Sequence, residues 1–172
     1  NNYTIGDDCI ISNVSVMETT EGATYGEGNL IAVLNEVGDG NVILFHDLNS
    51  QFAAFMVKHF NDKDLKNAIR RLVSEEIART NPDRGTIGNN VKIINTREIT
   101  NTVIQDDCEI SGASRLSDCT ILSSENASVF IGTGVICENS IISDGSSIVN
   151  SVKMQDCFVG EACQITNGFT AS

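Results

Sequence analysis

His46 and His59 are the only histidines in this sequence, and His46 is followed directly by Asp47. A histidine acts as a general base when a ring nitrogen reaches the proton of a hydroxyl or amine nucleophile, and a neighbouring carboxylate can orient the ring. His46 follows the apolar run 42–45, so we expect it at the exposed end of a strand, and it is our candidate catalytic residue. His59 falls within a predicted helix, where a packed or solvated ring is the simpler interpretation.

The remaining polar patterns favour structural roles. The sequence contains no CxxC motif and no Cys/His cluster, so we expect no metal site. The paired carboxylates Asp7-Asp8 and Asp106-Asp107 occupy matching positions in a repeat, which favours a recurring turn over catalysis. A glycine-rich nucleotide-binding loop is absent, and the segment 38–42 is better interpreted as a turn. No cofactor is evident from the residues alone.

The composition narrows the class of protein. The chain has 172 residues with 23 acidic against 11 basic side chains, a formal net charge of -12. Such a surface repels phosphate backbones and anionic lipids, so we expect no nucleic-acid partner and no membrane partner. The length suits one domain, and no apolar run approaches the roughly 20 residues of a spanning helix.

Aliphatic residues recur with a period that neither a helix nor a simple strand produces. The steps are five or six residues, and Ile87, Ile104 and Ile121 lie 17 residues apart. The register breaks at residues 123–128 and then resumes. This spacing predicts a three-sided β-helix with about 17–18 residues per coil. The markers are Ile87, Ile93, Ile99, Ile104, Ile110, Leu116, Ile121, Ile131, Cys137, Ile142, Ile148, Met154, Val159 and Ile165.

Two further features of the repeat predict its geometry. Residues four positions after the markers are mostly small or β-branched, and we expect them to point inward; on the third side they are Val103, Thr120, Ile141 and Phe158. One corner of each coil is shortened and carries Asn or Asp, for example in Ile99-Thr-Asn-Thr-Val-Ile. These residues tolerate the left-handed backbone angles that tight corners require.

Ile131-Gly-Thr-Gly-Val and Val159-Gly-Glu-Ala-Cys resemble the hexapeptide repeat. That resemblance covers residues 4–17 and 86–168, and it implies the left-handed parallel β-helix of acyltransferases and of sugar nucleotidyltransferase tails. The arrangement of coils and insertion also resembles a Bacteroidetes family without an established activity, often labelled as related to sugar-nucleotide pyrophosphorylases. The resemblance implies acyl-CoA or a nucleotide sugar as the ligand. Hexapeptide enzymes usually place their histidine within regular coils, where this chain has none.

A helical segment interrupts the repeat. Apolar residues at helical spacing follow Ser50, a plausible N-cap, and a second such run ends at Asn81-Pro82. We therefore predict N-terminal coils over residues 1–48, with the second coil irregular, then a helical hairpin over 49–83 and regular coils over 84–172. The apolar stripe of the helical hairpin is narrow, so we expect the hairpin to pack against the solenoid or against another subunit.

The six cysteines are predicted to be reduced. Cys108 and Cys163 fall on one side three coils apart, roughly 14 Å at about 4.8 Å per coil, which is beyond the reach of a disulfide. Reduced thiols acting as small core residues favour a cytoplasmic protein.

The uncapped coils lead us to expect self-association or further coils of the same chain beyond residue 172.

Three functions follow as alternatives. The first choice is a structural or oligomerising β-helical module of a transferase-like protein of unknown substrate. The second is an acyltransferase or sugar-nucleotide transferase, for which no complete catalytic motif is present. The third is a solenoid that binds a carbohydrate or a protein.

Overall fold

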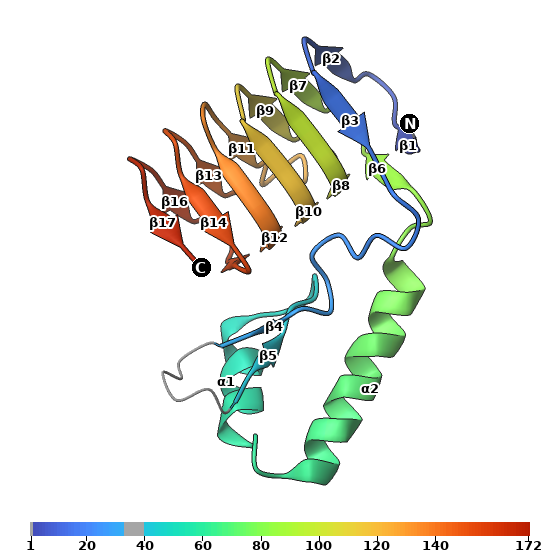
Figure 1. The fold of residues 1–172 in the computed structure, drawn as a ribbon, viewed down its shortest axis with the longest axis vertical. Coiled ribbons are helices and arrows are strands. Elements are labelled where there is room, and N and C mark those ends of the chain that lie inside the picture. The colour runs from blue at the N-terminus through green and yellow to red at the C-terminus, as the bar shows by residue number, and fades with distance from the viewer. Residues whose placement is uncertain (1, 33–39) are drawn as a thin grey trace.

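The computed structural model describes residues 2–32 and 40–172. Its main part is a β-solenoid in which short parallel strands stack coil upon coil (Figure 1). The larger sheet contains β1 (Tyr3–Ile5), β3 (Val16–Glu18), β6 (Gly85–Ile87), β8 (Glu98–Ile104), β10 (Arg115–Ile121), β12 (Ile136–Ile142), β14 (Lys153–Gln155), β15 (Phe158–Val159) and β17 (Thr170–Ala171). The smaller contains β2 (Ile10–Ser12), β7 (Lys92–Ile94), β9 (Glu109–Ser111), β11 (Phe130–Ile131), β13 (Ser147–Ile148) and β16 (Gln164–Ile165). The predicted solenoid with an inserted helical hairpin is confirmed.

Aliphatic columns fill the interior of the solenoid. Ile87 pairs with Ile104, Ile104 with Ile121, and Ile121 with Ile142, and all four side chains are buried. A second column runs through the smaller sheet from Ile93 to Ile165. Fully burying such a side chain contributes about 1.5–3 kcal/mol. The stacked inward register predicted from the 17-residue spacing is therefore confirmed.

The shortened corner is a single residue with left-handed backbone angles. Asn101, Asp118, Asn139 and Asp156 occupy it, with φ between 48° and 53°. Asn and Asp reach this region more readily than most residues, which explains their recurrence. At two successive corners the Asn101 Nδ2 group donates a hydrogen bond to Asp118 Oδ1 at 3.1 Å. In each of β8, β10 and β12, one left-handed residue thus lets a continuous strand bend at the corner and run along two sides of the coil.

The predicted inward set on the third side is wrong by one position. Thr102, Cys119 and Ser140 are the buried residues that follow the corner, whereas Ile141 belongs to a separate apolar cluster outside the solenoid. Strand side chains alternate, so an inward Ile104 requires an inward residue at 102 and an outward one at 103. The third side therefore offers its outer face to the insertion. The outward positions are Val103, Thr120, Ile141 and Phe158.

The insertion begins earlier than predicted. After β3 the chain leaves the solenoid and returns only at β6, and β4 (Leu30–Ile31) pairs antiparallel with β5 (Val42–Ile43). The irregular second coil expected within 18–48 is thus replaced by a hairpin in the described part of that segment. Two strands with antiparallel pairing satisfy each other's backbone groups without the solenoid. Residues 38 and 39 of the predicted turn lie outside the described residues.

Two helices complete the insertion. Helix α1 (Ser50–Lys58) is capped by Asn49, one residue before the predicted Ser50, and α2 (Lys63–Thr80) is capped by Asp62. Their apolar faces enclose Val42, Leu44 and Phe45 together with Ile141 of the solenoid. The outward residues Ile141 and Phe158 of the third side thereby pack against the insertion, which lies beside the coils in Figure 1. Neither helix combines the length and apolar character needed to cross a membrane.

Candidate functional site at the junction of insertion and solenoid

A turn over residues 24–28 presses against the corner of the solenoid. The Tyr25 carbonyl accepts a hydrogen bond of 2.8 Å from the Thr120 hydroxyl, and Tyr25 is buried. Gly26 has φ +82°, and a Cβ there would lie 2.6 Å from the carbonyl oxygen of Asp118. Only glycine allows this approach without displacement of backbone. The turn consequently buries the next residue, Glu27.

Glu27 meets His46 inside the junction. Glu27 Oε1 lies 3.0 Å from His46 Nδ1, and Glu27 is only 5% exposed. Burial raises the pKa of the Glu27 carboxyl, while the charge and hydrogen bonds of His46 act in the opposite direction. Glu27 Oε2 has no hydrogen-bond partner among the described residues. An Nδ1–H that donates to Glu27 leaves the other ring nitrogen, Nε2, free to accept or to ligate.

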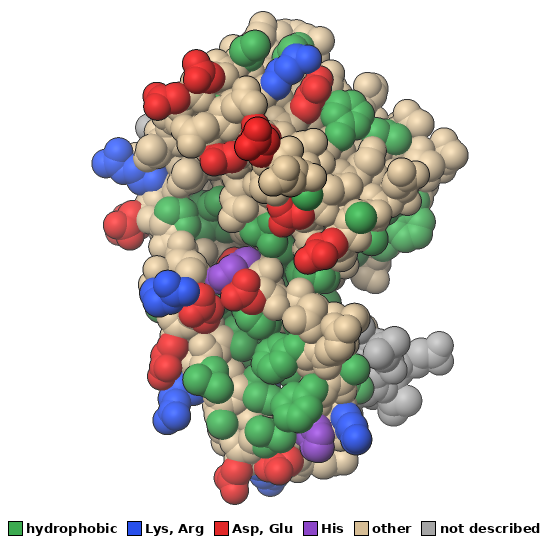
Figure 2. Space-filling model, turned by 180° about the vertical axis from the view of Figure 1, so that it is seen from behind, with side chains coloured by type: hydrophobic (Ala, Val, Ile, Leu, Met, Phe, Trp, Pro, Cys, Tyr) green, Lys and Arg blue, Asp and Glu red, His purple; other side chains and the backbone are tan. Residues whose placement is uncertain are grey.

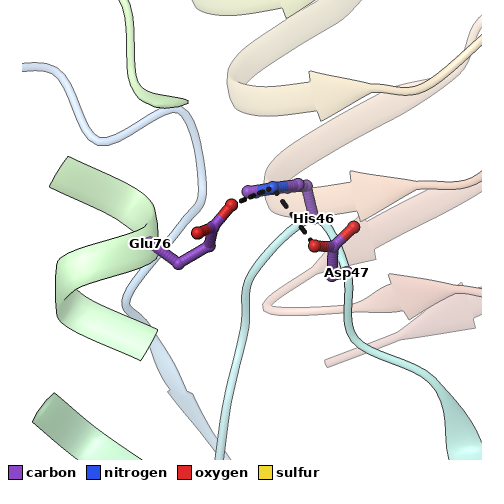
Figure 3. Close-up of side chains that lie close together, drawn as sticks. All are labelled: His46, Asp47 and Glu76. Atoms are coloured by element: carbon purple, nitrogen blue, oxygen red, sulfur yellow. Dashed lines mark ion pairs between the residues drawn. The ribbon is translucent and has the colours of Figure 1, made fainter. Parts of the chain in front are cut away.

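Two more carboxylates lie on the Nε2 side of the ring. His46 Nε2 is 3.7 Å from Asp47 Oδ2 and 3.6 Å from Glu76 Oε1 (Figure 3). Asp47 shares the loop after β5 with His46, whereas Glu76 reaches across from α2. Ligand atoms of the three residues lie within 4.8 Å of one another. One nitrogen and two oxygens thus converge beside a buried carboxylate.

Arg79 neutralises part of this charge. Its Nε lies 3.1 Å from Glu76 Oε2, and its Nη2 contacts Glu76 Oε1. The hydrogen bond from Arg79 lowers the pKa of Glu76, and the charges of Arg79 and His46 add to this effect. Glu76 Oε1 is therefore shared between the guanidinium and the histidine.

Of the candidate residues singled out in the sequence, His46 belongs to this cluster, whereas His59 and the paired aspartates lie elsewhere. His46 does lie beside carboxylates, but its hydrogen-bonded partner is Glu27, and Asp47 is the more distant one. His59 instead caps the end of α1, where its ring centroid lies 4.7 Å from that of Phe55. Asp8 and Asp107 both have left-handed backbone angles in turns, as expected. Glu27 and Glu76 were missed, because neither belongs to a repeat or a motif.

A cleft separates the insertion from the last coils, with His46 and Asp47 on its wall. Its volume is about 1160 Å³, and Figure 2 shows the hollow between the two parts of the molecule. Its ionisable lining includes Asp47, Asp144, Asp156 and Glu161, and no Lys or Arg among the described residues. Leu30, Leu122 and Phe158 add apolar surface. The cleft is thus acidic with apolar patches.

The six cysteines are free thiols. Cys108, Cys119 and Cys137 are buried in the solenoid core, as the predicted role of small core residues requires. Burial raises the pKa of Cys108 and of Cys119 to about 12. Such thiols are poor nucleophiles at neutral pH. Cys157 alone lines the cleft, and burial raises its pKa as well.

These features define a β-solenoid protein with a histidine–carboxylate cluster beside an acidic cleft. The model of the DUF4954 family, described as a domain of unknown function, matches residues 1–172, and the chain belongs to this family. No curated protein and no solved structure matches the chain.

Proposed function

We propose that this chain is a β-solenoid module that binds a neutral, hydroxyl-rich small molecule, a carbohydrate, in the cleft between insertion and coils. The observation that carries this proposal is the cleft itself. Its volume of about 1160 Å³ exceeds what a single small metabolite needs, since typical ligand pockets measure about 300–1,000 Å³. A sugar of more than one ring fits such a space.

The charge of the cleft selects among ligand classes. Carboxylates accept hydrogen bonds from several hydroxyl groups, and four acidic residues line the walls. The side chains of Phe158 and Leu30 offer apolar contact for a sugar ring. A diphosphate or a CoA tail would meet repulsion there, because the described lining has no basic side chain.

A transferase is the second candidate, and the Glu27–His46 pair favours it. A buried carboxylate that fixes the ring is typical of catalytic histidines. The resemblance to left-handed hexapeptide-repeat β-helices supports an acyl-CoA or a nucleotide sugar as the donor. Against this role, Asp47 and Glu76 occupy the space before Nε2, where a substrate hydroxyl would have to approach.

Ligand-observed NMR against three panels tests the proposal: neutral oligosaccharides, nucleotide sugars and acyl-CoAs, each with a chelator present. We expect saturation transfer to neutral sugars, and weaker transfer in Glu161→Gln, which removes a charge from the cleft wall. Glu75→Gln is the matched control, because it makes the same change at an exposed position on α2. Binding of nucleotide sugars or acyl-CoAs in preference to neutral sugars would favour the transferase. Absence of all binding would favour the structural module, for which light scattering reports self-association.

A further inference from the structure

The His46 cluster has the arrangement of a metal site, and this holds whatever occupies the cleft. Three side chains of ligating type converge there, with one nitrogen and two carboxylate oxygens within 4.8 Å. Metal–ligand bonds of about 2.0–2.2 Å in a tetrahedral site separate neighbouring ligand atoms by about 3.4 Å. The His46 Nε2 distances of 3.7 Å to Asp47 and 3.6 Å to Glu76 approach this value.

Glu27 supplies a second, independent observation. Its side chain is 4% exposed and is aimed at Nδ1, the ring nitrogen on the far side from the cluster. Histidines that ligate metals almost always donate their other ring N–H to a carboxylate, a carbonyl or water, which fixes the tautomer and raises the basicity of the ligating nitrogen. The buried carboxylate therefore holds the ring as a metal ligand requires.

The charge balance points the same way. Glu27, Asp47 and Glu76 bring three carboxyl groups around one imidazole, and Arg79 forms an ion pair with Glu76. Asp47 and Glu76 are not buried, so the cost here is repulsion between like charges held close together, and a divalent cation between His46, Asp47 and Glu76 would offset that repulsion. The cleft wall beside it leaves room for a further ligand, a water or a sugar hydroxyl.

We propose that His46 Nε2, Asp47 and Glu76 bind one divalent transition-metal ion of the Zn²⁺ class, with Glu27 as the outer-sphere partner of His46. Imidazole with carboxylates suits Zn²⁺ better than Mg²⁺ or Ca²⁺, which prefer oxygen ligands alone. The site would join the 24–28 turn, the loop after β5 and α2. It would thus tie the insertion together at the edge of the cleft.

Zn²⁺ and Co²⁺ titrations of the chelator-treated chain test this proposal. We expect one equivalent to bind, with a rise in melting temperature. The Co²⁺ complex should lack the thiolate charge-transfer bands that ligation by the free cysteines would produce. Such bands, or loss of binding after the accessible thiols are blocked, would overturn the assignment to His46, Asp47 and Glu76.

Paired variants locate the site. We expect His46→Gln and Glu76→Gln to weaken binding by at least the about 10–100-fold expected for Glu27→Gln, which removes the outer-sphere carboxylate. The matched controls are His59→Gln, the other histidine, and Glu75→Gln, the neighbouring glutamate on α2. Circular dichroism checks that each variant folds, and the partly exposed Glu76 is the more tolerant position. One-equivalent binding that is equal in Glu76→Gln and Glu75→Gln would contradict the proposal.

Arg79 offers a test in the opposite direction. Because its guanidinium competes for Glu76, Arg79→Gln should tighten metal binding. Arg71→Gln is the control, since Arg71 pairs with Glu75 instead. Weaker binding in Arg79→Gln than in Arg71→Gln would contradict the role given to Glu76.

Discussion

Glu27 Oε1 and His46 Nδ1 lie 3.0 Å apart although the two residues are separated by 19 positions in the sequence. The contact joins the turn that docks on the solenoid to the loop that follows β5. A carboxylate as buried as Glu27 is costly without a partner, so the imidazole stabilises the turn, and the turn in return orients the imidazole. Removing either side chain would therefore disturb the fold and the site together. Conservative variants, which keep the size of the side chain, are needed to tell the two effects apart.

The raised pKa of Glu27 gives stability a pH dependence of definite sign. Burial makes the folded state hold the proton of this carboxyl more tightly than the unfolded chain does. The linked stabilisation is present below the ordinary value of 4.5 and is lost as pH rises through the raised pKa. Relative to Glu27→Gln, the wild-type free energy of unfolding should therefore fall across this window.

Urea denaturation with a chelator present, from about pH 4 to about pH 8, measures this difference. Glu75→Gln, at an exposed position, controls for the change of charge. A wild-type advantage over Glu27→Gln that grows with pH would contradict the prediction.

Gly26→Ala should destabilise the docking of the insertion. Alanine with left-handed backbone angles costs about 1–2 kcal/mol, and here the new Cβ would also meet the carbonyl of Asp118 at 2.6 Å. Gly22→Ala is the matched control, since its φ is +77° and nothing lies within 4 Å of the added atom. We expect Gly26→Ala to lose at least about 1 kcal/mol more than the control in urea denaturation. Equal losses would show that the turn does not press on the solenoid.

The corner residue Asn139 should reverse the usual ranking of alanine and glycine. Its φ of 49° strains alanine by about 1–2 kcal/mol but suits glycine. Asn139→Ala should therefore unfold at lower urea concentration than Asn139→Gly. Both variants remove the same amide, so the comparison isolates the backbone, and the opposite order would contradict a left-handed corner.

Thiol labelling should follow burial. Cys108 and Cys119 combine burial with a pKa of about 12, so little thiolate forms at neutral pH and reagents have no access. Cys9 and Cys163 are only partly buried. Iodoacetamide followed by peptide mass spectrometry should find Cys9 and Cys163 modified first, and Cys108 and Cys119 only after unfolding. Early modification of Cys119 would contradict the buried column.

The solenoid could be predicted because its contacts recur at a fixed separation. Ile87, Ile104 and Ile121 reveal their stacking through equal spacing, and Asn or Asp at the corner reveals the turned backbone. What the spacing could not resolve was the position beside the corner. The left-handed residue Asn101 occupies the corner and interrupts the in-and-out alternation of side chains. The alternation restarts after it, so Thr102 faces inward and Val103 outward.

Only two of the four residues of the site, His46 and Asp47, could be predicted to lie together from the sequence. His46 and Asp47 are adjacent, so their proximity was certain. Glu27 and Glu76 reach the same place from a turn and a helix in the insertion, which has no period from which to infer contacts. The two glycines of the YGEG sequence at residues 25–28 carried one signal, because glycine is favoured where the backbone adopts left-handed angles, and both Gly26 and Gly28 do so.

The excursion between β3 and β6 leaves neighbouring coils far apart along the chain. Thr4 pairs with Thr86, whereas Thr86 pairs with Val103 only 17 residues further on. Closing the longer loop costs about 1.4 kcal/mol more by chain entropy alone. Folding should accordingly nucleate among the coils after residue 84 and reach the first coil last. We also expect that coil to exchange its amide protons first, because it opens more readily than the later coils, whose contacts are local in sequence.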